Sequence, residues 1–473
     1  MQRSDNDEDQ SEHGEPKRRR RAGSTEDRQK RTGRAGVYVP IDLAPTRVDG
    51  KTPRHAPEAR LAEALGLAAA IDLEIVASGI IPLRQIRPGT LIGTGKVEEI
   101  KAAVAEHHLD LVIFDHALSP VQQRNLEKAL SAKVLDRTGL ILEIFGERAR
   151  TKEGRLQVEL AHLVYQKSRL VRSWTHLERQ RGGAGFLGGP GETQIELDKR
   201  MLQERIEALE EDLEKVKRTR ELHRVGRRQV PYPIVALVGY TNAGKSTLFN
   251  AITGAGVLAK DLLFATLDPT MREVRLVSGR RMILADTVGF ISELPTMLIA
   301  AFRATLEEVL EADIILHVRD IADAESEAQR GDVLRVLEEL GIEVEGPGCP
   351  IIEVWNKTDL LAPERREMLC LQAAREQPPA VLVSSVSGDG VDALLAAIDA
   401  RMAVGDDIVS LEVAPAEGRL LAWLHDNTEV LERSSSEEGQ VRVRVRVDPT
   451  RRGRLMARLE AAGEERARIL RPG

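Results

Sequence analysis

The sequence has few cysteines, no long apolar run and no excess of positive charge. Its only cysteines, Cys349 and Cys370, are too few for a disulfide framework or a cysteine zinc site, and they suit a reducing compartment. No apolar run is as long as a membrane span, and no signal-peptide pattern opens the chain. The formal net charge of −7 gives no overall case for nucleic acid, so any such contact would use local patches. We therefore expect a cytoplasmic protein without a membrane span.

One stretch, Gly239 to Ser246, fits the phosphate-loop pattern G-x-x-x-x-G-K-[ST]. It follows an apolar run, 234–238, and we expect it to lead from a strand into a helix. Small residues let backbone N–H groups turn toward a polyphosphate, and the start of the helix adds its positive end. We expect Lys245 to reach the β- and γ-phosphates and Ser246 to bind Mg²⁺. The predicted nucleotide contacts here are Gly239, Tyr240, Thr241, Asn242, Ala243, Gly244, Lys245, Ser246 and Thr247.

A second stretch, Asn356 to Asp359, predicts that the base is guanine. It ends the apolar run 351–355, at the carboxyl end of a predicted parallel strand, where open α/β sheets bind ligands. The Asp359 carboxylate can accept hydrogen bonds from guanine N1–H and the 2-amino group, which adenine does not offer. An unpaired buried acceptor costs about 1–3 kcal/mol, which favours GTP by roughly one or two decades. The predicted base contacts are Asn356, Lys357, Thr358 and Asp359, followed by Ser384, Ser385 and Val386, whose N–H groups would meet the guanine carbonyl.

Two further stretches are typical of switch segments. Asp286, Thr287, Val288 and Gly289 follow the run 282–285; Asp286 would hold Mg²⁺ through water, and the Gly289 N–H would approach the γ-phosphate. The stretch Phe264, Ala265, Thr266, Leu267 and Asp268 supplies a hydroxyl for the metal, although spacing does not choose between Thr266 and Thr270.

The residue after Gly289 departs from the common switch pattern. Many GTPases have a glutamine there that orients the attacking water, but this chain has Phe290. We therefore predict slow intrinsic hydrolysis, with another group completing the orientation of the water. Asn242 is a candidate ligand for a monovalent cation or, equally, a cap of the loop backbone.

The rest of the chain suggests an α/β domain before the phosphate loop and smaller elements after it. Strands are predicted at 37–43, 71–77, 90–93, 111–114 and 133–135, and helices at 60–67, 96–107 and 120–130. Gly93 to Lys96 resembles a phosphate-binding turn, but its spacing favours a turn between strand and helix. Beyond the phosphate loop, 273–277 and 281–285 predict a hairpin that adds an antiparallel edge, 313–319 a strand, and 294–310 and 322–340 helices.

Long helices are predicted at 152–177 and 193–225, around a glycine-rich loop at 179–191. We expect an antiparallel hairpin with this loop at its tip. Four arginines there either contact RNA phosphates or are ordinary solvated side chains: Arg169, Arg172, Arg179 and Arg181. Near the chain end, a strand at 441–447 alternates valines with Arg442, Arg444 and Arg446, which either meet RNA or solubilise an edge strand. Helices are predicted beside it at 418–424 and 455–461.

With these motifs together, the sequence resembles the HflX family of ribosome-associated GTPases. The most specific stretches are Gly189 to Glu196 and Asp136 to Leu142, beside the phosphate loop and the other nucleotide motifs. The resemblance implies a GTPase that binds the large ribosomal subunit, with the glycine-rich tip near the peptidyl-transferase region, and that helps rescue or split stalled ribosomes. It also implies Thr266 as the metal ligand and an apolar residue at Phe290. Leu187 and Gly188 stand where the family has Arg before Gly-Pro-Gly, which leaves one expected RNA contact unsupported.

The predicted fold is α/β, with a P-loop GTPase domain and accessory domains. We expect a disordered charged tail at 1–35, an N-terminal α/β domain at 36–150, a helical hairpin at 151–230, a GTPase domain at 231–405 and a small α+β domain at 406–473. The predicted catalytic residues are Lys245, Thr266 and Gly289, and the predicted Mg²⁺ ligands are Ser246, Thr266 and, through water, Asp286. We expect a monomer that binds GTP, GDP and ribosomal RNA of the large subunit. The main alternative is a nucleotide-gated RNA-binding or assembly module with incidental hydrolysis; separate ATP use by the N-terminal domain ranks below both.

Overall fold

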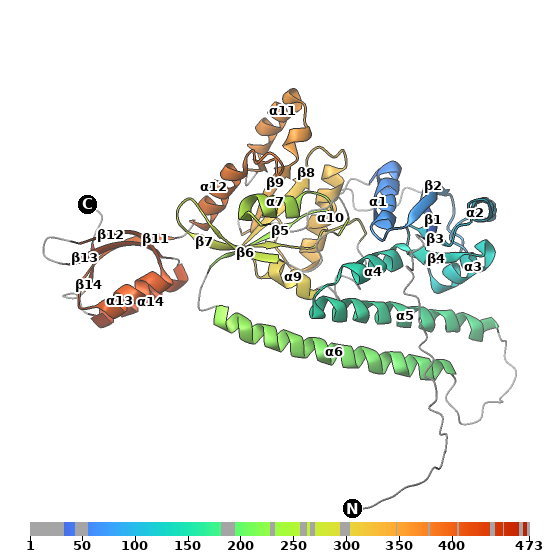
Figure 1. Cartoon of the computed structure of the whole chain (residues 1–473), viewed down its shortest axis with the longest axis horizontal. Helices are drawn as coiled ribbons and strands as arrows, with labels where there is room; N and C mark the ends of the chain where they lie inside the picture. Colours follow the sequence, from blue (N-terminus) through green and yellow to red (C-terminus); the bar gives the residue numbers. More distant parts are fainter. Residues whose placement is uncertain are drawn as a thin grey trace, which may run out of the picture. The chain divides into compact units, whose positions relative to one another are not determined.

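The computed structural model describes most of the chain, and three β-sheets organise it (Figure 1). The described residues are 33–42, 55–180, 194–227, 232–255, 263–264, 270–293, 303–346, 348–376, 379–403, 406–435, 440–447, 449–462 and 467–470. Among the described helices, none combines the length and the apolar composition that a membrane span requires.

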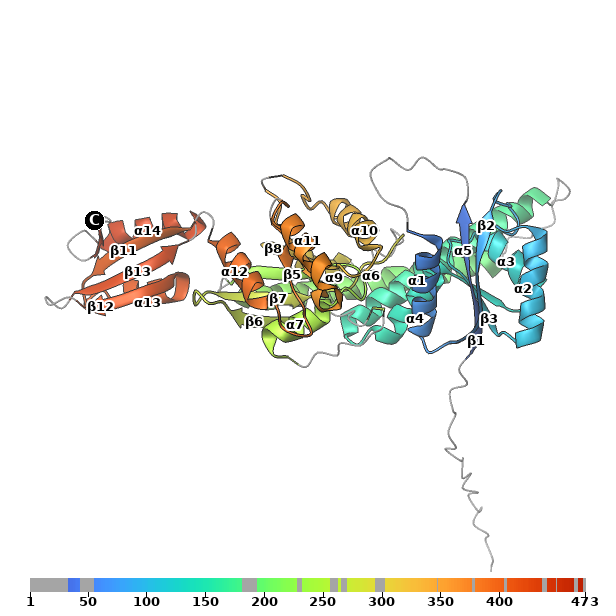
Figure 2. The same cartoon turned by 90° about the horizontal axis from the view of Figure 1, so that it is seen from above.

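The first sheet is a four-stranded parallel sheet in the order β2-β1-β3-β4. Its strands are β1 (Arg34–Asp42), β2 (Glu74–Leu83), β3 (Leu111–Phe114) and β4 (Lys133–Asp136). Its helices are α1 (Pro57–Ala69), α2 (Thr94–His107), α3 (Pro120–Leu130) and α4 (Arg137–Arg148). Helices α1 and α4 cover one face and α2 and α3 the other (Figure 2), which gives the predicted α/β layers.

Two local features of this domain differ from the sequence prediction. The strand predicted at 90–93 is wrong, because Leu91 has a φ of 64° in a turn that its amide closes onto the Arg87 carbonyl at 2.8 Å. Gly93 caps α2 directly, so the turn before Lys96 does start a helix. Helix α4 was not predicted; the Asp136 carboxylate accepts from the Gly139 N–H at 2.8 Å and starts it.

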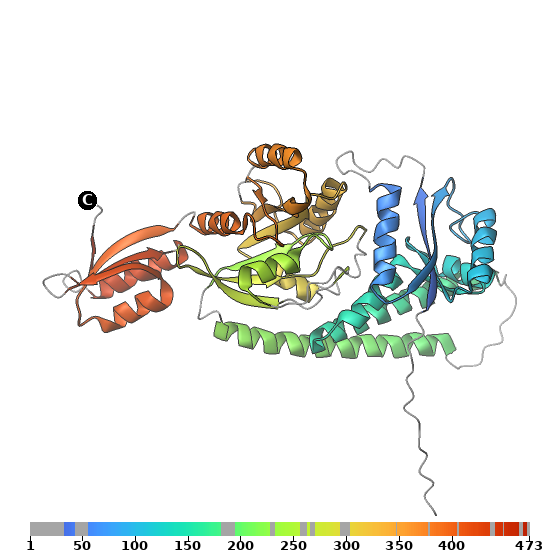
Figure 3. The same ribbon diagram turned by 45° about the horizontal axis from the view of Figure 1, so that its top comes forward.

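The predicted long helices are present as α5 (Lys152–Gln180) and α6 (Gln194–Arg227), which lie side by side (Figures 1 and 3). Buried Ile206, Leu209 and Leu213 give α6 an apolar face, and Arg205 pairs with Glu159 of α5 at 2.6 Å. This agrees with the predicted hairpin. Most of the predicted tip loop, with Arg181 and the Thr193 cap, lies outside the described residues.

The second sheet has six strands in the order β10-β9-β8-β5-β7-β6. Its strands are β5 (Ile234–Val238), β6 (Thr270–Arg275), β7 (Arg281–Asp286), β8 (Ile314–Asp320), β9 (Ile351–Asn356) and β10 (Val381–Leu382). Only the β6 pairing is antiparallel, so the predicted edge hairpin is confirmed. Apolar clusters place α7 (Lys245–Thr253) and α12 (Val391–Met402) on one face, and α9 (Arg303–Leu310) and α10 (Ser326–Glu339) on the other. The short helix η1 (Thr358–Leu360) and α11 (Pro363–Ala373) follow β9.

The third sheet is antiparallel, in the order β12-β13-β11-β14. Its elements are β11 (Asp407–Val413), α13 (Gly418–Asn427), β12 (Glu429–Ser435), β13 (Val441–Val447), α14 (Pro449–Ala462) and β14 (Ala467–Leu470). This βαββαβ order is that of a ferredoxin-like domain. Both helices pack on the same face of the sheet (Figure 3), against the buried valines of β13.

The arginines of β13 do not lie on an edge strand, so that interpretation was wrong: β13 is an inner strand. Each arginine pairs with a glutamate of a neighbouring strand. The pairs are Arg442 with Glu412 at 2.9 Å, Arg444 with Glu432 at 3.5 Å and Arg446 with Glu429 at 3.0 Å. These cross-strand pairs neutralise much of the basic character that the sequence suggested.

Candidate active site

The loop between β5 and α7 follows the backbone path that the sequence predicts for a phosphate loop. Gly239 has a φ of 149°, and a Cβ there would lie 2.1 Å from the Val318 carbonyl oxygen. Gly244 has a φ of 93°, and a Cβ there would lie 2.2 Å from Asn356 Nδ2. Any side chain at either position would therefore collide with a neighbouring strand or with the predicted base-binding segment. Asn242 has a left-handed φ of 60°, which asparagine tolerates.

Lys245 is buried at the start of α7, and its ammonium donates to carbonyl oxygens of its own loop. Nζ lies 3.0 Å from the Gly239 oxygen and 2.7 Å from the Tyr240 oxygen. Burial lowers the pKa of Lys245 to about 8, although the Asp286 carboxylate acts in the opposite direction. A positive charge therefore sits at the mouth of the loop at neutral pH, where a polyphosphate would be attracted.

A hydroxyl and a carboxylate meet beside this lysine. Ser246 Oγ donates to Asp286 Oδ2 at 2.8 Å, and Asp286 is fully buried at the end of β7. These are hard oxygen donors of the kind that Mg²⁺ prefers. The structure thus brings together two of the three predicted metal ligands; Thr266, with Ala265, Leu267 and Asp268, lies outside the described residues.

The segment after Asp286 lies directly on the phosphate loop. The Phe290 N–H donates to the Gly239 oxygen at 3.1 Å, and the Thr241 N–H donates to the Phe290 oxygen at 2.7 Å. A Cβ on Gly289 would lie 2.9 Å from Thr241 Cγ2 and 3.1 Å from Lys245 Nζ. Only glycine fits this close approach. Thr287 and Val288, between the two ends of this segment, are buried.

The predicted base-binding residues also converge. Asn356 Nδ2 donates to the Ala243 oxygen at 2.8 Å, and Asn356 Oδ1 accepts from Ser385 N at 3.0 Å and Ser385 Oγ at 2.7 Å. The Asp359 carboxylate accepts from Ser384 Oγ at 2.6 Å. The Asn356 side-chain amide therefore connects the phosphate loop to the predicted base-binding segment 384–386.

The remaining predicted contacts differ in their exposure. The Lys357 ammonium pairs with Asp320 at 2.7 Å, and Thr358 Oγ1 donates to the Val383 oxygen at 3.0 Å. The Val386 side chain is exposed. Phe264 is buried with its ring edge-on to Phe145 of α4, at 4.7 Å between centroids, so its side chain belongs to the core.

Four families of known domains match successive parts of the chain. They are described as GTP-binding GTPase N-terminal (residues 58–146), GTP-binding GTPase Middle Region (148–227), 50S ribosome-binding GTPase (234–357) and HflX C-terminal domain (369–467). The GTPase HflX of Magnetococcus marinus is 50% identical over 88% of this chain and 95% of its own length. This chain belongs to the HflX family of GTPases.

Other HflX proteins match at similar levels. The Escherichia coli GTPase HflX is 46% identical over 76% of this chain and 83% of its own length. The Caldanaerobacter subterraneus GTPase HflX is 43% identical over 81% of this chain and 86% of its own length. The resemblance inferred from the motifs is therefore confirmed, and membership of the HflX family makes this chain a GTP hydrolase.

Phe290, the residue that replaces the usual glutamine, is almost fully buried. It belongs to an apolar cluster that also contains Ala64 and Leu67 of α1 and Ile141 and Phe145 of α4. Its ring is therefore part of a core shared by the first two sheets' domains and is not available to orient a water molecule.

A buried polar network beside Phe290 was not predicted from the sequence of this HflX member. The Arg137 guanidinium pairs with Asp115 and Glu63 and donates to the Ser292 carbonyl oxygen at 2.7 Å. The Tyr240 hydroxyl donates to Glu63 and accepts from the Ser292 N–H at 2.8 Å. The one signal in the sequence was an arginine placed between an apolar strand and an apolar helical run, which is costly unless the charge is paired.

Arg169, one of the arginines proposed to contact RNA, is engaged within the protein. Its guanidinium pairs with the buried Asp136 and lies 4.2 Å from the Tyr165 ring centroid. The side chains of Arg172 and Arg179 lie outside the described set. The tip contacts therefore stay a prediction.

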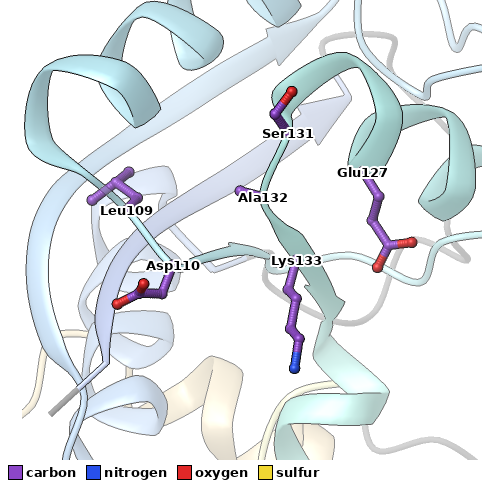
Figure 4. A pocket seen from close by; sticks show the side chains of 6 residues that line it. All are labelled: Leu109, Asp110, Glu127, Ser131, Ala132 and Lys133. Atoms are coloured by element: carbon purple, nitrogen blue, oxygen red, sulfur yellow. The ribbon is translucent and has the colours of Figure 1, made fainter. Parts of the chain in front are cut away.

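The N-terminal domain has a shallow surface pocket of about 540 Å³ at the amino ends of β3 and β4 (Figure 4). The Asp110 carboxylate accepts from the Arg34 N–H at 3.1 Å, and the Glu127 carboxylate from the Val134 N–H at 3.4 Å. Both acids are thus engaged with backbone groups, and the pocket lies at the end of the sheet opposite to Arg137.

Proposed function

We propose that this HflX member is a Mg²⁺-dependent GTPase that binds the large ribosomal subunit and helps rescue or split stalled ribosomes. One observation carries the enzymatic part: Lys245, the Ser246–Asp286 pair and Asn356 meet at one edge of the six-stranded sheet. The family description of residues 234–357, a 50S ribosome-binding GTPase, supports the ribosomal part. We infer a cytoplasmic location, since ribosomes are its proposed partner, and we propose that the protein acts as a monomer.

In this proposal each motif has one task. Lys245 binds the β- and γ-phosphates, helped by the N–H groups of residues 239–247 and the positive end of α7. The Gly289 N–H contacts the γ-phosphate and Asp359 selects guanine, with 384–386 beside the base. The Asp359 carboxylate accepts a hydrogen bond from Ser384 Oγ at 2.6 Å, so it is already held in place in the predicted base site.

The metal ligands in this proposal are Ser246, Thr266 and, through water, Asp286. The Ser246 hydroxyl and the Asp286 carboxylate fit Mg²⁺, which keeps several waters and binds through few protein oxygens. Within the described residues no group of three or more His, Cys, Asp or Glu could hold a metal, which agrees with an ion held largely by phosphates and water. When bound, Mg²⁺ neutralises charge that develops on the phosphate oxygens. Asn242 remains either a ligand for a monovalent cation or a cap of the loop, and comparing turnover in potassium and sodium salts tests the first role.

The decisive experiment is steady-state GTP hydrolysis with and without purified large ribosomal subunits, at low and moderate salt. We expect slow basal turnover and strong stimulation by the subunits. Lys245→Ala, which removes the phosphate-binding ammonium, should abolish both and serves as the blank. Binding to subunits without stimulation would instead support a nucleotide-gated RNA-binding or assembly module. Hydrolysis of ATP that survives Lys245→Ala would point to a separate site.

A further inference from the structure

Hydrolysis of GTP by this chain requires a polar group that orients water near Gly289. Phe290 cannot be that group, because its side chain is apolar and the residue is 1% exposed within the shared apolar core. Its backbone is also committed, since its N–H and carbonyl bond to Gly239 and Thr241. The orienting group must therefore come from another residue that reaches the same place.

Three parts of the site meet at that place. A Cβ on Gly289 would touch both Thr241 Cγ2 and Lys245 Nζ, so these two side chains and Gly289 converge on one point. The proposed function puts the γ-phosphate there, because Lys245 and the Gly289 N–H both serve it. The attacking water must lie in the same small volume.

The Thr241 methyl group faces this point, and the unused hydroxyl is carried by the same Cβ atom. The residue is 6% exposed, and Oγ1 is buried without a hydrogen-bond partner among the described residues. Buried hydroxyls in proteins are nearly always paired, so an orphan at a ligand site calls for a partner that comes with the ligand.

Neighbouring polar groups are already engaged. The Tyr240 hydroxyl bonds to Glu63 and the Ser292 N–H. The Lys245 ammonium bonds to loop carbonyls and would serve the phosphates. Asp286 Oδ2 accepts from Ser246. Among the described residues next to Gly289, Thr241 thus has a hydroxyl with hydrogen-bonding capacity to spare.

We propose that the Thr241 hydroxyl holds the attacking water against the γ-phosphate, the task that glutamine performs in other GTPases. In this step the water oxygen bonds to the γ-phosphorus and one water proton passes to a γ-phosphate oxygen. The bond from that phosphorus to the β–γ bridging oxygen breaks, its electron pair stays on the β-phosphate of GDP, and GDP and inorganic phosphate leave. Thr241 only donates and accepts hydrogen bonds, so it is unchanged at the end. This inference rests on the proposed GTPase site and adds a catalytic residue to it.

The test compares Thr241→Val, which keeps the shape and removes the hydroxyl, with Thr241→Ser, which keeps the hydroxyl. We expect Thr241→Val to lower the single-turnover rate of GTP hydrolysis roughly 100-fold and Thr241→Ser to stay close to wild type. Affinity for GDP and for a non-hydrolysable GTP analogue should be unchanged. Affinity for GDP with aluminium fluoride, which mimics the transition state, should fall in Thr241→Val but not in Thr241→Ser.

Thr253→Val, in the last turn of α7, is the control for loss of a threonine hydroxyl, which there donates to the Phe249 carbonyl at 2.7 Å. Equal rates and equal aluminium-fluoride affinity in wild type and Thr241→Val would overturn the inference. If Thr241→Val did not fold, as its melting temperature and GDP affinity would reveal, Thr241→Ala would carry the same comparison. A wild type that binds GTP without hydrolysing it would refute the proposed function, while the aluminium-fluoride comparison would still decide the role of Thr241.

Discussion

The parallel four-stranded sheet and the mostly parallel six-stranded sheet use their carboxyl edges in opposite ways. In the six-stranded sheet, the carboxyl ends of β5, β7 and β9 lead into the phosphate loop, Asp286 and Asn356. In the four-stranded sheet, the carboxyl ends of β3 and β4 lead into Asp115 and Arg137. The first set converges on a site for a small molecule, whereas the second binds Ser292 of the neighbouring domain.

This contrast shows that architecture locates a binding edge while side-chain chemistry decides what binds. Open α/β sheets bind ligands at their carboxyl edge. The phosphate-loop edge offers an ammonium and a helix start, which attract phosphates. The other edge has the buried Asp115 carboxylate and the half-buried Glu63 carboxylate around Arg137, and these disfavour a polyphosphate. That charge balance argues against a second nucleotide site at this edge.

The largest expected effect comes from breaking the ion pairs of Arg137 at the carboxyl edge of the four-stranded sheet. Arg137→Ala would remove the cation that buried Asp115 and half-buried Glu63 share, leaving the longer pair of Asp115 with Arg60 at 3.3 Å, so we expect the free energy of unfolding to fall by about 3 kcal/mol. Urea unfolding followed by circular dichroism measures this. Arg124→Ala, on the exposed side of α3, is the control and should change stability little. A loss below about 1 kcal/mol in Arg137→Ala would mean that the network contributes no more than a surface pair.

A middle-sized effect should come from the predicted base-binding residue Asp359, at the carboxyl edge of the six-stranded sheet. Asp359→Ala removes the acceptor for guanine, so we expect GDP affinity to fall roughly 10- to 100-fold. The preference for GDP over inosine diphosphate, which lacks the 2-amino group, should disappear at the same time. Calorimetric titration measures both affinities. Asp389→Ala changes an exposed carboxylate that pairs weakly with Arg366 at 3.8 Å, and it should leave that preference intact. A preference retained in Asp359→Ala would assign guanine selection to other groups.

The smallest effect concerns the charge of Lys245 in the phosphate loop. Because burial lowers the pKa of Lys245 to about 8, the ammonium is present below that pH and is lost as the pH rises through it. We expect GDP affinity to fall about tenfold between pH 7 and about pH 9, since only the charged form attracts phosphate. Fluorescent GDP titrations across this range provide the measurement. Lys245→Arg keeps its charge, so its affinity should not vary with pH, and a flat wild-type profile would contradict this role for Lys245.

The nucleotide edge could be predicted from the sequence because its groups come in short contiguous motifs. The eight residues from Gly239 to Ser246 carry the loop, and Asn356 ends β9 only three residues before Asp359 in η1. Spacing within such a motif constrains geometry directly. The hairpin of β6 and β7 was predictable for the same reason, since its two strands are adjacent in the chain.

The polar network around Arg137 could not be predicted, because the residues that Arg137 contacts are far from it in the chain. Arg137 meets residues 74 and 155 positions away, Glu63 and Ser292, and no local pattern encodes that pairing. Similarly, the valine and arginine alternation of β13 predicted a half-buried strand but not its place in the sheet. The 90–93 prediction failed because three apolar or β-branched positions suggested extension where Leu91 takes a left-handed turn.

The paired arginines of the C-terminal sheet also determine how this region responds to ions. Binding to a nucleic acid releases condensed counterions, and each phosphate neutralised by a free cation steepens the salt dependence. Arg442, Arg444 and Arg446 already have glutamate partners, so each would have to exchange one anion for another. This face should therefore contribute little to the salt dependence of ribosome binding, whose slope would report contacts made elsewhere in the chain.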